Sequence, residues 1–164
     1  MIMFMKITGQ LLTQVQCDLE RPHPFAFERV GFLFVKQGTI ENDNKLLLTT
    51  YYMSIPDEQY IPDPTVGARY NSDAIRGVMQ RILDTEEGAF HIHMHSPFFP
   101  VFSSDDRANQ QRLMPAFRNV GMKGIHGAIL LTEHTIVGLC WLPGEKNPQK
   151  ISRIHIIDRP CKIY

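Results

Sequence analysis

The sequence has no excess of charge of either sign. Its 164 residues include seventeen Lys and Arg against seventeen Asp and Glu, so the formal net charge at pH 7 is zero. A protein that binds nucleic acid or an anionic membrane surface usually carries a basic surplus with which it neutralises phosphates. The composition therefore argues against nucleic acid and against membranes as partners.

Cysteines and long apolar runs are also scarce. Cys17, Cys140 and Cys161 are widely spaced and form no C-x-x-C pair, which is typical of reduced thiols in the cytosol. The apolar start of the chain is interrupted at Lys6, long before it reaches the length of a signal peptide's apolar region. The run from Ile136 to Leu142 is too short to span a bilayer. We therefore expect a cytoplasmic protein.

The chain is predicted to form one domain over residues 1–164. No repeat, low-complexity tract or Gly/Ser linker divides it, and 43% hydrophobic residues suffice for one core. Helices are predicted from Ser72 to Asp84, where apolar residues recur at helical spacing, and from Ser104 to Asn119, with Pro115 marking a kink or an earlier end. The predicted strands are Lys6 to Gln16, Arg29 to Val35, Lys45 to Ser54, Ala89 to His95, His126 to Thr132, Thr135 to Leu142 and Ile151 to Ile157.

These strands and helices do not alternate regularly. The pattern predicts an α+β fold with three layers (α/β/α), in which helices flank a mixed β-sheet. Two of the strands resemble a hairpin closed by the segment from Gly38 to Asn44. After it, the segment from Ile55 to Tyr70 has three prolines and several acids, which indicates a long irregular loop. Loops of this length are more often functional than idle.

The strand Phe90-His91-Ile92-His93-Met94-His95 carries the most informative pattern. Because side chains alternate across a strand, its three histidines share one face, and its apolar residues share the other. Two histidines one residue apart can direct their ring nitrogens at a single metal ion. We interpret His91 as a residue that orients a ligand or contacts substrate, or as a merely solvated histidine, rather than as a further nitrogen ligand.

Asp106, at the start of the second predicted helix, can complete the ligand set. His93, His95 and Asp106 would supply two nitrogens and a carboxylate oxygen, which leaves the fourth position of a tetrahedral site for water. Zinc lowers the pKa of such a water and polarises a bound carbonyl. Ser103-x-x-Asp106 also fits a helix N-capping pattern, which is the alternative interpretation of these two residues.

Glu28 is the candidate general base. It stands before the predicted strand that begins at Arg29 and is flanked by Phe25 and Phe27, where partial desolvation can tune its pKa. A carboxylate beside a metal can take a proton from the attacking water and return it to the leaving amine.

These residues together resemble the signature of the JAMM (JAB/MPN) metalloproteases. The match consists of His93-x-His95, seven residues, Ser103, two residues and Asp106, with Glu28 upstream. The resemblance implies a JAB/MPN domain of cytidine-deaminase-like architecture. It further implies one catalytic Zn²⁺ bound by His93, His95 and Asp106, Glu28 as general acid/base, and Ser103 as a stabiliser of the oxyanion. The family usually has Ser or Thr where this chain has Met94.

The implied substrate is a ubiquitin-like protein, cut after its C-terminal glycine. Three features resemble bacterial members that are encoded beside ubiquitin-like, activating-enzyme-like and conjugating-enzyme-like proteins: the segment from Arg21 to Phe34, the His-rich strand, and the late Trp141 to Gly144. That resemblance implies a role in antiphage defence, with these proteins as partners.

Two other function classes compete with a metalloprotease. A non-catalytic MPN scaffold would bind partner proteins, but such scaffolds typically lack one or more ligands, and this chain keeps all of them. A metallo-β-lactamase would need an Asp-His pair where Ser96-Pro97 stands, and a cupin would be almost wholly β, unlike the segment from Ser72 to Asp84.

Overall fold

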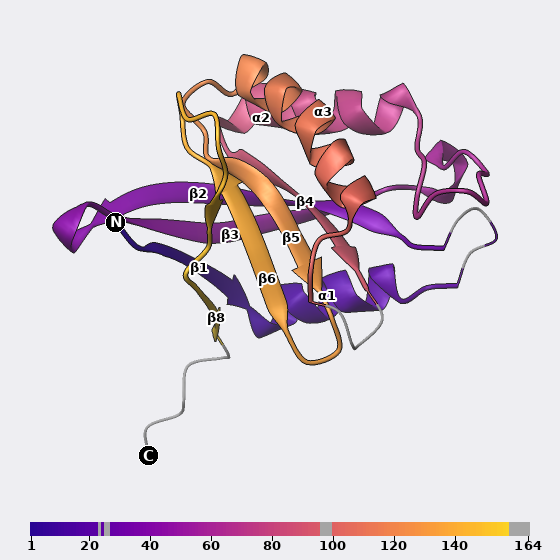
Figure 1. Cartoon of the computed structure of the whole chain (residues 1–164), viewed down its shortest axis with the longest axis horizontal. Helices are drawn as coiled ribbons and strands as arrows, with labels where there is room; N and C mark the ends of the chain where they lie inside the picture. Colours follow the sequence, from indigo (N-terminus) through magenta and orange to yellow (C-terminus); the bar gives the residue numbers. More distant parts are fainter. Residues whose placement is uncertain (23, 25–26, 96–99, 158–164) are drawn as a thin grey trace.

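The computed structural model describes residues 1–22, 24, 27–95 and 100–157, whose strands form one mixed sheet (Figure 1). The strand order is β7-β6-β5-β4-β2-β3-β1-β8. Strand β4 lies between β2, to which it is antiparallel, and β5, to which it is parallel. The strands are β1 (Met3–Thr8), β2 (Val30–Ile40), β3 (Asn44–Ser54), β4 (Gly88–Met94), β5 (His126–Leu131), β6 (Ile136–Trp141), β7 (Gln149–Lys150) and β8 (Arg153–Ile157).

Helices cover both faces of this sheet (Figure 1). Helix α1 (Gly9–Leu19) packs against the face that carries Phe90 and Ile92 of β4. Helices α2 (Ser72–Thr85) and α3 (Ser104–Val120) cover the opposite face, where Ala89 lies in the same core. The expected α+β fold with a mixed sheet is therefore confirmed. Over the described ranges, no helix has both the length and the apolarity needed to cross a membrane.

The prediction of a strand from Lys6 to Gln16 was wrong. The strand ends at Thr8, whose hydroxyl accepts a hydrogen bond from the Leu11 amide at 3.2 Å and so caps α1. Leu12, Val15 and Leu19 follow at helical spacing and are the buried residues of that helix. Their periodicity was the signal for a helix, but the neighbouring strand-forming residues concealed it.

The other predicted elements occur near their expected positions. Helix α3 continues through Pro115 to Val120, so the proline does not end it. Strands β2 and β3 form the expected hairpin, and its turn lies at Glu41–Asp43. In the loop from Ile55 to Tyr70, the regular features are a single 3₁₀ turn at Asp57–Gln59 and a bridge between Tyr60 and Tyr70.

Candidate metal centre

The two histidines of β4, His91 and His93, face the layer of α2 and α3, as strand alternation predicts. The sheet pairs His93 with Val30 of β2 on one side and with Leu130 of β5 on the other. This central position buries the His93 side chain, which is 1% exposed. His95 follows the last residue of the strand and is held by a hydrogen bond from its amide to the Leu131 carbonyl at 2.9 Å.

The ring nitrogens of His93 and His95 converge with the carboxylate of Asp106. The two Nε2 atoms lie 3.2 Å apart. Asp106 Oδ1 lies 3.0 Å from His93 Nε2, and Asp106 Oδ2 lies 3.4 Å from His95 Nε2. Asp106 reaches this point because α3 begins at Ser104, beside the end of β4. The structure thus brings together all three residues that the sequence predicts as metal ligands.

The separations among these donor atoms fit a small tetrahedral metal ion. For metal–nitrogen distances of about 2.0–2.1 Å, neighbouring ligand atoms of a tetrahedral site lie about 3.3 Å apart. The two Nε2 atoms lie 3.2 Å apart, and each lies 3.0–3.4 Å from one of the two Asp106 carboxylate oxygens. Two imidazole nitrogens and a carboxylate oxygen are also a donor set that zinc accepts. The cluster can therefore hold a metal ion.

Glu28 completes this cluster. Its Oε1 lies 3.5 Å from His95 Nε2, and the ligand atoms of the four residues all lie within 4.8 Å of one another. The antiparallel register explains the position, because Val30 pairs with His93 and residue 28 therefore runs alongside residue 95. Burial raises the pKa of Glu28; the nearby His93 and His95 act to lower it, and Asp106 adds to the rise.

We expected the flanking Phe25 and Phe27 to desolvate Glu28, and of these two the structure describes Phe27. Phe27 is 76% exposed, so it contributes little shielding, and Phe25 lies outside the described residues. Gly67, in the loop between β3 and α2, lies close to the carboxylate.

Ser103 and Asp106 form a capping box at the start of α3. The Ser103 hydroxyl donates to Asp106 Oδ2 at 2.8 Å and accepts from the Asp106 amide at 3.1 Å, and the Ser103 amide donates to the same carboxylate oxygen at 2.7 Å. Burial acts to raise the pKa of Asp106, but the hydrogen bonds from His93 and Ser103 outweigh it and hold this pKa well below its usual range. Asp106 therefore takes part in the cap of α3 and at the same time directs its carboxylate at the ring nitrogens of His93 and His95.

His91 lies beside the cluster and outside the group of ligand atoms. Its ring centroid is 5.5 Å from that of His93 and 5.6 Å from that of Phe32. Burial lowers the pKa of His91 to about 3, so this imidazole is neutral at physiological pH. Its Nε2 is buried without a hydrogen-bond partner among the described residues.

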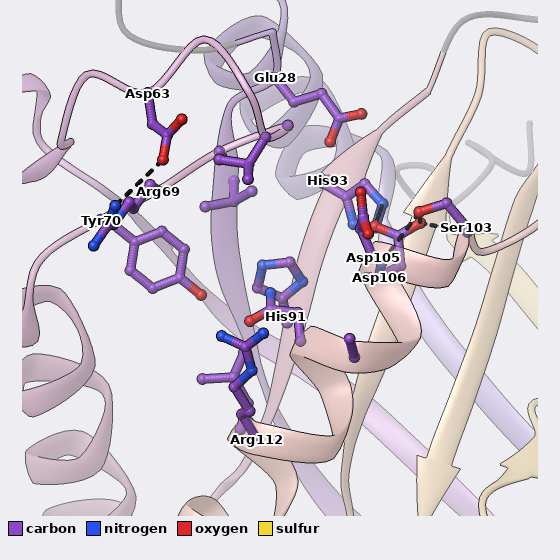
Figure 2. Close-up of a pocket in the computed structure, with 17 residues that line it drawn as sticks. Glu28, Asp63, Arg69, Tyr70, His91, His93, Ser103, Asp105, Asp106 and Arg112 are labelled. Atoms are coloured by element: carbon purple, nitrogen blue, oxygen red, sulfur yellow. Dashed lines mark hydrogen bonds and ion pairs between the residues drawn. The ribbon is translucent and has the colours of Figure 1, made fainter.

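A cavity of about 610 Å³ opens beside the cluster. Residues 63 and 66–70 of the loop form one wall, Ser103 and the part of α3 up to Leu113 form another, and His91 and His93 line it from β4 (Figure 2). In this view Glu28, Ser103 and Asp106 gather near His93, and Arg112 lies farther along α3. The length of the loop predicted that it is functional, but no feature of the sequence indicated that Arg112 or Gly67 lies at the site.

No family model and no curated protein matches the sequence. Among solved structures, this chain is similar to the N-terminal domain of STIL from Trichoplax adhaerens, with 10% sequence identity and a TM-score of 0.39. The similarity covers 82% of this chain and 39% of that chain. We therefore base the function on the chemistry of the site.

Proposed function

We propose that this protein is a cytoplasmic zinc metallopeptidase of the JAMM type, which cleaves the amide bond after the C-terminal glycine of a ubiquitin-like protein. The observation that carries this proposal is the cluster of Glu28, His93, His95 and Asp106, whose ligand atoms lie within 4.8 Å of one another. These four residues match the JAMM spacing in the sequence, and they come together from three separate elements of the fold.

His93, His95 and Asp106 would hold the zinc ion, and Glu28 would handle the proton. With zinc bound, the site would supply a water of lowered pKa and polarise the scissile carbonyl. Glu28 Oε1 lies 3.5 Å from His95 Nε2, close enough for its carboxylate to take the proton of that water and pass it to the leaving amine. Ser103, which lines the cavity, would add the oxyanion contact that the resemblance implies.

The substrate tail would enter through the 610 Å³ cavity. Strand β4 is paired along both sides, so a tail cannot add to it as a further strand. The cavity runs past the metal ligands between α3 and the loop, which suits a narrow, extended peptide. In the bacterial setting that the resemblance implies, the substrate belongs to a ubiquitin-like conjugation system active in antiphage defence, together with its activating-enzyme-like and conjugating-enzyme-like proteins.

A zinc measurement combined with a cleavage assay tests this proposal. Purified protein should contain about one equivalent of zinc and should cleave a ubiquitin-like protein that carries a C-terminal extension, in a chelator-sensitive manner. Glu28→Gln should retain the zinc and lose roughly 10²–10⁴-fold in kcat, as expected when a general base is removed. A Glu28→Gln protein as fast as wild type would contradict the role of Glu28. A protein that binds the substrate with zinc present but never cleaves it would support the non-catalytic scaffold instead.

A further inference from the structure

The residues that lead into β2 are fastened to the loop between β3 and α2, which we call the 55–70 loop. The Glu28 amide donates to the Gly67 carbonyl at 2.9 Å. The Val30 amide donates to the Tyr60 hydroxyl at 3.0 Å, and that hydroxyl donates to the Val30 carbonyl at 3.1 Å. Hydrogen bonds from the backbone of Glu28 and of Val30 to one loop therefore hold the segment that carries the proposed general base.

Arg29, between these two residues, makes a third connection. Its side chain is 2% exposed, and its guanidinium donates to Asp57 of the same loop at 2.7 Å. The guanidinium also donates to the Arg21 carbonyl at 2.8 Å and lies over the Tyr60 ring, 5.7 Å from its centroid. A buried charge that loses its partner is costly, so this connection is hard to break.

The 55–70 loop also has contacts of its own, which join its residue 60 end to its residue 70 end. Tyr60 and Tyr70 form an isolated β-bridge. Beside it, the Ile61 amide donates to the Arg69 carbonyl at 2.8 Å. The two ends of the segment from residue 60 to residue 70 are thereby held together, and Gly67 stands between them.

Gly67 comes so close to the Glu28 side chain that a side chain at residue 67 would displace the carboxylate. A Cβ atom at residue 67 would lie 2.9 Å from Glu28 Oε2 and 3.2 Å from Glu28 Cδ. Ordinary carbon–oxygen contacts are about 3.3–3.6 Å. The backbone at Gly67 has no positive φ, so an alanine there meets only this contact, and the carboxylate is the group that must yield.

We propose that the 55–70 loop is the positioning element for Glu28, and that the bare backbone of Gly67 sets where the carboxylate stands relative to the metal ligands. This inference rests on the proposed function, in which Glu28 is the base. Residues 63 and 66–70 also line the cavity, so one loop shapes both the substrate's path and the placement of the base. Gly67 is a positioning residue that acts through Glu28 and takes no part in the reaction itself.

The test compares Gly67→Ala with Gly38→Ala, a control in β2 at which a Cβ would meet nothing within 4 Å. Gly67→Ala should push the carboxylate back by about half an ångström, and a misplacement of about 1 Å can cost 10²-fold in rate. We therefore expect kcat to fall about tenfold, with KM within about twofold of wild type and with zinc content and melting temperature unchanged. Gly38→Ala should match wild type in all four quantities.

A double-mutant cycle with Glu28→Gln shows whether the effect passes through Glu28. Gly67→Ala should cause no further loss in the residual cleavage of the Glu28→Gln protein, because the group it displaces no longer acts as a base. A tenfold loss in both backgrounds, or no loss in either, would overturn the inference while leaving the proposed function intact.

Crystal structures of the zinc-bound wild-type and Gly67→Ala proteins supply a readout that needs no activity. The Glu28 carboxylate should be displaced in the variant, with His93, His95 and Asp106 unmoved. If wild type cleaves no substrate, the proposed function fails on its own, and the structures still decide the placement: a carboxylate at the same position in both would refute the role of Gly67.

Discussion

Replacing Ser103 by alanine separates two roles for its hydroxyl, because each role predicts a different measurement. In the structure this hydroxyl donates to Asp106 Oδ2 and accepts from the Asp106 amide. Asp106 Oδ2 receives two hydrogen bonds from Ser103, one from the hydroxyl and one from the backbone amide. Alanine removes the first and leaves the second.

The expected loss of zinc affinity follows from this count. Partners that orient metal ligands typically contribute 10–100-fold to metal affinity. Since one of the two bonds to Oδ2 survives, we expect Ser103→Ala to weaken zinc binding about tenfold, at the low end of that range. The lost N-cap should also cost about 0.5–2 kcal/mol of stability, which corresponds to roughly 1–8 °C in melting temperature for a domain of this size.

Two variants serve as controls in a competition titration with a chromophoric chelator. Thr8→Ala removes the hydroxyl that caps α1, which accepts from the Leu11 amide at 3.2 Å. It should lower the melting temperature similarly and leave zinc affinity unchanged. Ser103→Thr keeps a hydroxyl and should retain wild-type affinity. If Ser103→Ala binds zinc within about twofold of wild type but loses 10²–10³-fold in kcat, the hydroxyl acts on the oxyanion, and the orienting role is refuted.

Two further outcomes are expected. Zinc at one hundred times its dissociation constant should stabilise the fold by about 2.7 kcal/mol, so a chelator should lower the melting temperature by roughly 5–10 °C; an unchanged melting curve would mean that the cluster binds no ion. Gly31→Ala should destabilise the protein by about 1–3 kcal/mol in thermal or denaturant unfolding, because a Cβ there would lie 2.3 Å from the Tyr52 hydroxyl. That hydroxyl is fixed by a 2.6 Å hydrogen bond to Asp18, and an alanine variant of wild-type stability would contradict this packing.

The meeting of the candidate metal ligands could be predicted because their geometry is local. Alternation along β4 places His93 and His95 on one face, and the segment up to Asp106 is short enough that the start of α3 must lie near the end of that strand. The capping pattern at Ser103 gave a second local signal, and in the structure the capping box includes Asp106, the candidate ligand.

The helix from Gly9 to Leu19 shows the limit of local patterns. Thr13 and Val15 favour a strand by propensity, but Leu12, Val15 and Leu19 are buried against the sheet only if the segment is helical. The packing of the whole domain decides between these states. The contact between Gly67 and Glu28 could not be predicted either, since the local sequence of neither residue indicates the other.

The position of Glu28 depends on sheet register rather than on a motif. Residue 28 lies alongside residue 95 only because Val30 pairs with His93 in antiparallel strands. A slip of one residue would turn every side chain of β2 to the opposite face and would carry Phe32 and Phe34 out of the core that they share with α2 and α3. The burial of these two rings therefore holds the register that brings Glu28 to the metal ligands, and the 55–70 loop fixes the side chain within it. The stability of the core and the geometry of the candidate site thus depend on the same strand pairing.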